Sequence, residues 1–204
     1  MKKLLMLGVL ALALPMAVFA SSGVDYTNSG GTLSGSNSGL SLTGSVLVAV
    51  NGLNGGGLIT GNDLGSVAFS TGALTSGSLQ MGGTFAGGGW FTITGNGTNG
   101  VPSGTLFTGT FTDPVTWTLV TLANGTHNYT LTGMLEGTSG NFSTVGVTVQ
   151  LTINTGKGFF NGTTTISSGD TNVVVPEPGS LSLLGTGLIG LAGVVRRKLK
   201  GAKP

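Results

Sequence analysis

Side chains able to act as catalysts or metal ligands are scarce in this 204-residue chain, which has one histidine and no cysteine. A Ser–His–Asp site needs its histidine beside an activated serine, with a carboxylate to orient the ring. His127 instead follows the turn-forming pair Asn124-Gly125, so we expect it to be an exposed turn residue. Zinc sites use several cysteine and histidine ligands. The sequence therefore predicts neither a metal site nor a catalytic centre of this kind.

Paired carboxylates are the other chemistry to weigh, because glycoside hydrolysis uses two of them across the scissile bond. Five acids lie between the two ends of the chain: Asp25, Asp63, Asp113, Glu136 and Asp170. Asp63 and Asp170 stand in Gly-Asn-Asp and Gly-Asp-Thr-Asn sequences, where aspartate commonly forms turns through local hydrogen bonds. Their oxygens would also suit calcium, but the alternating acids of a calcium loop are missing. We expect turn-forming acids, no cofactor and no enzyme.

Aromatic side chains offer a third possibility, since flat rings stack on the C–H faces of sugars. The candidates for such a platform are Trp90, Phe91, Trp117, Tyr129, Phe159 and Phe160. Their spacing fits a hydrophobic core equally well, because Trp90 and Phe91 would point to opposite faces of one strand. Core packing is the interpretation favoured for most of them. Carbohydrate contact by Trp90 or Trp117 stays open.

The N-terminus has the three parts of a secretory signal peptide. Lys2-Lys3 supply the charged region, residues 4–14 are apolar, and small residues precede a cleavage site between Ala20 and Ser21. The apolar core is too short to span a bilayer and is interrupted by Pro15. We therefore expect residues 1–20 to be removed during export, with the Sec translocon and signal peptidase as partners.

The C-terminus carries a second targeting segment, at residues 176–200, before a short tail at 201–204. Pro176-Glu177-Pro178 is followed by an apolar stretch over 179–195, about 25 Å long if helical. That length is slightly short of the ~30 Å hydrocarbon core, which suggests transient insertion in the inner membrane. The basic residues behind the stretch would hold this end in the cytoplasm. They are Arg196, Arg197, Lys198 and Lys200.

This order of proline motif, apolar stretch and basic stop resembles a PEP-CTERM sorting domain. The resemblance is carried by residues 175–181, reading Val-Pro-Glu-Pro-Gly-Ser-Leu, and by the glycine- and leucine-rich stretch after them. It implies processing by exosortase, a membrane-embedded enzyme similar to cysteine transpeptidases that is thought to cut near Pro-Glu-Pro. It also implies a Gram-negative, exopolysaccharide-producing bacterium, with the protein released to the cell envelope, surface or extracellular matrix. An ordinary C-terminal membrane helix is the alternative.

Charge excludes one class of partner once both ends are set aside. The whole chain is formally +2, but only Lys157 among its eight basic residues lies within residues 21–176. Against five acids, that region carries a net charge of −4. Binding of DNA or RNA needs clustered cations to neutralise phosphates. We therefore expect no nucleic-acid partner.

The elements that must position these side chains are short β-strands. Alternation is strictest over 145–153, where apolar residues at odd positions share one face. Glycine supplies 40 residues, which favours tight turns between strands, and no 3.6-residue periodicity occurs in 21–175. We predict a flexible leader or weak edge strand at 21–40, a β-rich domain at 41–167 and a linker at 168–175. The domain is predicted to be a single antiparallel β-sandwich or jelly-roll, although these patterns do not distinguish a sandwich from a barrel.

The sequence thus favours an exported, non-enzymatic envelope or matrix protein that is structural or adhesive in an exopolysaccharide or biofilm setting. A carbohydrate-binding module that attaches to the cell's own exopolysaccharide is the alternative. A glycan-active enzyme is the least favoured interpretation, because it would need a cleft that gathers at least two of the five acids.

Overall fold

The computed structural model describes residues 22–140, 142–144 and 146–175, and nearly all of them belong to one antiparallel β-structure. The signal peptide and its cleavage site, the Pro-Glu-Pro motif, the apolar stretch and the basic stop lie outside these residues. Within the described ranges, no helix is both long and apolar enough to cross a membrane. The prediction of a mainly β domain is confirmed.

Among the described residues, the domain has fourteen strands and one 3₁₀ turn, η2 (Leu53–Gly55). The strands are β1 (Ser22–Ser29), β2 (Thr32–Ser36), β3 (Gly39–Asn51), β4 (Ile59–Ser70), β5 (Leu74–Ser78), β6 (Gly82–Phe85), β7 (Gly88–Asn96), β8 (Ser103–Phe111), β9 (Val115–Thr121), β10 (His127–Ser139), β11 (Phe142–Ser143), β12 (Gly146–Asn154), β13 (Thr163–Thr165) and β14 (Ser168–Val175). Hairpin connections between most of them are short, and glycines with positive φ occupy many of the turns.

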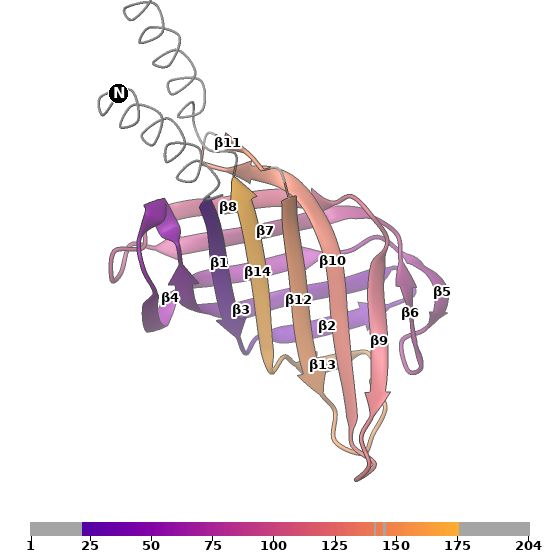
Figure 1. Cartoon of the computed structure of the whole chain (residues 1–204). Helices are drawn as coiled ribbons and strands as arrows, with labels where there is room; N and C mark the ends of the chain where they lie inside the picture. The colour runs from indigo at the N-terminus through magenta and orange to yellow at the C-terminus, as the bar shows by residue number, and fades with distance from the viewer. Residues whose placement is uncertain (1–21, 141, 145, 176–204) are drawn as a thin grey trace, which may run out of the picture. The chain divides into compact units, whose positions relative to one another are not determined.

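Eight of the strands close into a barrel, in the order β12-β14-β1-β3-β4-β7-β8-β10, and β10 then pairs with β12 to complete the ring. Figure 1 shows β1, β14, β12 and β10 side by side in one layer, crossing β3, β4, β7 and β8 in the layer behind. The prediction of a sandwich or jelly-roll is therefore wrong in its architecture. A sandwich and a barrel both bury one face of every strand, so the alternation of apolar residues is the same in each.

Closure depends on the length of β10. One of its edges pairs with β12 over residues 128–135. The other edge pairs with β9 over residues 127–132 and with β8 over residues 135–138. β10 thus belongs both to the ring and to a side sheet of β9, β6 and β5, while β2 and β13 form a smaller branch beside β3.

The two ends of the barrel domain correct the predicted boundaries. The expected leader at 21–40 contains β1, which is paired on both edges, with β14 and β3. The expected linker at 168–175 is β14, paired with β1 and β12. Both segments are polar because only alternate residues face the core, as Val24 and Tyr26 do on β1. A strand with neighbours on both sides needs no continuous apolar run.

The barrel interior is filled by inward-facing side chains from every ring strand. It includes a phenylalanine cluster, in which Phe69 and Phe91 stack at 5.7 Å and Phe111 meets both rings edge-on. β12 follows the predicted alternation, with its odd-numbered residues from Val147 to Ile153 buried. The inner face is therefore a packed core, and candidate sites lie on the outer face.

Candidate functional site in the front-layer groove

The outer face of the front layer carries an open groove of about 560 Å³. Its floor comes from β1, β14, β12, β10 and β9, and one wall comes from Asp113 and Pro114 in the β8–β9 loop. Three of the five acids expected to form turns meet here, namely Asp25, Asp113 and Asp170. Asp25 and Asp170 lie within β1 and β14 rather than in turns, which corrects their predicted role.

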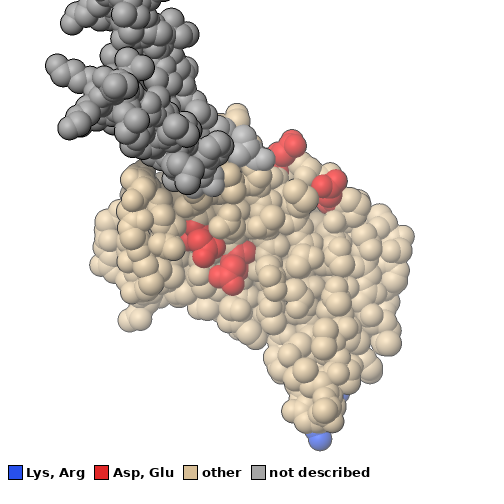
Figure 2. Space-filling view, viewed as in Figure 1, with Lys and Arg blue, Asp and Glu red and all other residues tan. Residues whose placement is uncertain are grey.

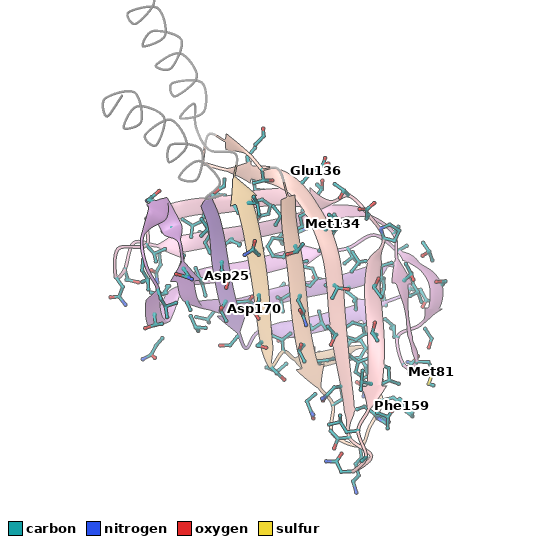
Figure 3. The ribbon with its side chains drawn as sticks, in the orientation of Figure 1. Asp25, Met81, Met134, Glu136, Phe159 and Asp170 are labelled. Atoms are coloured by element: carbon teal, nitrogen blue, oxygen red, sulfur yellow. The ribbon has the colours of Figure 1, made fainter. Side chains whose placement is uncertain are left out.

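Cross-strand register fixes the order of the side chains across the groove. One row reads Asp25, Asn172, Thr148 and Met134. The next row reads Thr27, Asp170, Gln150, Thr132 and Thr116. Figure 3 shows Asp25 and Asp170 on β1 and β14, with Met134 farther across the sheet on β10. The surface is therefore an ordered array of hydroxyl, amide and carboxylate groups.

Electrostatically the groove is acidic. Partial burial, and then the negative charge of Asp170, raise the pKa of Asp25 above its ordinary value. In Figure 2 this face shows acidic atoms over its upper part, and blue appears only at the lower tip. Lys157 is the sole cationic side chain in the described ranges and does not line the groove. A ligand here would meet carboxylates without any competing cation.

Metal-binding groups are sparse around these acids. Within residues 22–140, 142–144 and 146–175, no three His, Cys, Asp or Glu side chains are grouped so as to hold a metal ion. The remaining acids lie apart from the groove. Asp63 lies within β4 rather than in a turn, at a stretch where the pairing with β3 shifts register. It does form the predicted local hydrogen bond, because its Oδ1 accepts from the Gly65 N–H at 3.1 Å and also from Asn96 Nδ2 at 3.1 Å. Glu136 is exposed on β10.

His127 is not the exposed turn residue expected from its neighbours, because it begins β10 and is only 8% exposed. Its ring stacks on Phe159 at 4.2 Å. Its Nδ1 lies 3.2 Å from the Gly158 carbonyl oxygen, an acceptor, so this nitrogen donates the hydrogen bond. The imidazole thus fastens the loop after β12. In the sequence, His127 alternates with Tyr129 and Leu131, and this pattern could have indicated that its side chain faces inward.

The two tryptophans have different environments. Trp117 is 1% exposed, stacks on Tyr129 at 5.0 Å and donates its indole N–H to the Leu79 carbonyl oxygen at 2.9 Å. Trp117 is therefore a core residue that cannot contact a sugar, which corrects the suggestion that it contacts carbohydrate. Trp90, on β7, is 46% exposed and keeps that possibility. Phe159 is also exposed, whereas Phe91 and Phe160 are buried.

Comparison with protein families gives one match, to the PEP-CTERM protein-sorting motif, over residues 174–198. The chain carries a PEP-CTERM sorting motif. The match contains the predicted Pro176-Glu177-Pro178 and three of the four basic residues, with Lys200 just beyond it. No curated protein and no solved structure matches the chain.

The PEP-CTERM motif establishes the route of the protein. It implies export, processing by the membrane enzyme exosortase and membrane-associated sorting to the cell envelope. The match begins at Val174, so it overlaps the last two residues of β14, the last barrel strand. No separate linker stands between the barrel strand and the Pro-Glu-Pro sequence.

Proposed function

We propose that the protein is a non-enzymatic structural or adhesive component of the envelope or extracellular matrix of a Gram-negative bacterium, in contact with exopolysaccharide. The observation that carries this proposal is the ordered polar face of the front layer, described above, on a protein with a PEP-CTERM motif. Hydroxyl and amide side chains both donate and accept hydrogen bonds, as polysaccharide hydroxyls do. A rigid sheet presents them without the entropic cost of ordering loops.

Two alternatives have an observation in their favour. A carbohydrate-binding module that uses aromatic stacking now depends on Trp90, because Trp117 is buried. A glycan-active enzyme is favoured by the gathering of Asp25 and Asp170, which are diagonal neighbours on β1 and β14, a relation that places Cβ atoms somewhat less than about 7–8 Å apart. Glycosidases hold their two carboxyl groups about 5–9.5 Å apart, a spacing that side chains at such positions can reach.

The acid pair nevertheless fits binding better than hydrolysis. Glycosidase carboxylates flank the scissile bond so that one protonates the leaving group while the other acts at the sugar. Asp25 and Asp170 instead project from adjacent strands of one sheet face. They therefore meet a ligand from the same side. If the purified protein released new reducing ends from the native exopolysaccharide, the enzyme alternative would replace our proposal.

Cell fractionation tests the proposed role. We expect the full chain to co-purify with the envelope and matrix polysaccharide, and deletion of residues 176–204 to move it to the periplasmic or soluble fraction. Intact mass of the recovered protein would report both processing sites and any attached glycan. Trp90→Ala should leave matrix retention unchanged, since the polar groove is intact. If this variant were no longer retained in the matrix, the aromatic-stacking alternative would be favoured. Unchanged location after the deletion, or a matrix unaffected by loss of the protein, would contradict the proposal.

A further inference from the structure

The acids of the front-layer groove have unused capacity to accept hydrogen bonds. Within the described parts of the chain, the carboxylates of Asp25, Asp113 and Asp170 form no hydrogen bond or ion pair with another side chain, in contrast to Asp63. Ionised carboxylates only accept hydrogen bonds, and each offers two oxygens. The groove therefore suits a ligand rich in donors.

Charge narrows the ligand further. The described domain holds five acids and one lysine, and three of those acids line this groove. An anionic polymer such as a polyuronate would meet repulsion here, whereas an ammonium group would find two neighbouring carboxylates. Partial burial and then the charge of Asp170 raise the pKa of Asp25, and a bound cation would offset the second of these causes.

The groove also has the extent and surface of a polymer site. From β14 to β9 it crosses three strand spacings, or about 14 Å, which exceeds one sugar ring. Thr116, Thr132 and Gln150 provide donors and acceptors along this path. Met134, 49% exposed, and Pro114 add apolar surface for the C–H faces of sugar rings.

We propose that this groove binds a polysaccharide with free amino groups, such as a partly deacetylated hexosamine polymer. The ammonium groups lie against Asp25 and Asp170, and the ring hydroxyls bond to the threonine and amide side chains. This inference rests on the proposed function, which it deepens by naming the class of polysaccharide. It assigns no bond-making or bond-breaking step to the groove.

Calorimetric titration of the full chain in non-ionic detergent tests this site, with glucosamine hexamer as the probe. N-acetylglucosamine hexamer removes the positive charge at constant length, and an alginate oligomer reverses it. We expect the glucosamine hexamer to bind and the other two to bind at least tenfold more weakly. Added salt should weaken the interaction, because it screens partly exposed charges.

Matched variants separate the groove from general electrostatic attraction. Asp25→Asn combined with Asp170→Asn should lower affinity at least tenfold, since it removes the two charge-assisted hydrogen bonds to the ammonium groups. Asp63→Asn combined with Glu136→Gln changes the net charge equally, at positions that do not line the groove, and should keep affinity within about twofold. Circular dichroism would confirm that both double variants remain folded.

Three results would overturn the proposal. They are equal losses in both double variants, equal affinity for the acetylated hexamer, and alginate binding that requires calcium and is reversed by EDTA. Failure of this proposal can be distinguished from failure of the proposed function. Matrix retention without glucosamine binding would reject the groove and leave the function standing, whereas glucosamine binding by a protein absent from the envelope and matrix would do the reverse.

Discussion

Asp25 and Asp170 show how a single pair of residues can favour ligand contact over stability. Both project from the outer face, on directly paired strands, and no described side chain neutralises either of them. Their mutual repulsion and the partial burial of Asp25 act against the folded state whenever both are ionised. A purely structural strand would be more stable with asparagine or threonine at these positions, as at Asn172 and Thr148 nearby.

Asp25 should make the stability of the folded domain depend on pH. Because its pKa in the folded protein is raised, protonation favours folding; this contribution is complete below the ordinary pKa of 3.8 and is lost as pH rises through the raised value. Asp25→Asn should therefore raise the midpoint of thermal unfolding at pH 7 and change it little at pH 3. Differential scanning calorimetry at both pH values measures this.

Glu136→Gln is the control for Asp25→Asn, because Glu136 is an exposed acid on β10, outside the groove. Its unfolding midpoint should follow the wild type at both pH values. If Asp25→Asn raised the unfolding midpoint as much at pH 3 as at pH 7, the stabilisation would not come from removal of the Asp25 charge.

Sequence reasoning at this scale succeeded where a residue's role is local. Asp63 makes the local side-chain hydrogen bond that the Gly-Asn-Asp pattern predicts, to the Gly65 N–H, although it lies within β4 and not in a turn. The meeting of Asp25 with Asp170 could not be predicted, because it depends on the first and last strands being neighbours. Trp90 and Trp117 could not be distinguished either, since both stand in alternating strands and only the tertiary packing differs.

At the scale of strands, glycine lets the backbones of neighbouring strands approach closely. Gly137 on β10 is paired with Gly109 on β8, and a Cβ on Gly137 would meet the Thr108 carbonyl oxygen and the Phe107 ring. Gly146 on β12 has open space around the same position and no positive φ. The close approach of β10 and β8 therefore requires glycine at position 137, whereas β12 does not require it at position 146.

Alanine substitution should separate these two glycines. Gly137→Ala is expected to destabilise the domain by about 1–3 kcal/mol, because the backbone of β8 cannot move without breaking its ladder. Gly146→Ala should be neutral or stabilising by up to about 1 kcal/mol, since it restricts the unfolded chain. Urea unfolding measures both. Equal effects of the two substitutions would show that the β10–β8 approach is looser than the structure has it.

Strand boundaries were predictable from alternation in the middle of the chain and not at its ends. Residues 145–153 alternate strictly, and β12 occupies nearly all of that range. β1 and β14 are short, polar on one face and rich in serine, glycine or asparagine, a composition shared with linkers. Their status as strands follows from pairing on both edges, which is a long-range property.

For the whole molecule, closure of the barrel is the property that sequence periodicity could not reveal. It requires β12 to pair with β10 and β14 with β1, contacts that join distant parts of the chain. Ser22 pairs with Val175, so the barrel begins just after the predicted signal cleavage site and ends just before Pro176. The barrel can close only after its last strand has crossed the membrane, and removal of the sorting motif beyond that strand leaves every ladder intact.

Two truncations test this arrangement. Deletion of residues 176–204 should leave the unfolding midpoint of the domain unchanged, because every described strand is retained. Deletion of residues 168–204 should abolish cooperative unfolding and expose the chain to protease, since it removes β14 together with the buried Thr171 and Val173. It also leaves β1 and β12 with open edges that promote aggregation. Limited proteolysis and calorimetry of both proteins decide the matter: if the shorter chain kept the same midpoint, β14 would be the linker that its composition suggests, and the barrel would not depend on it.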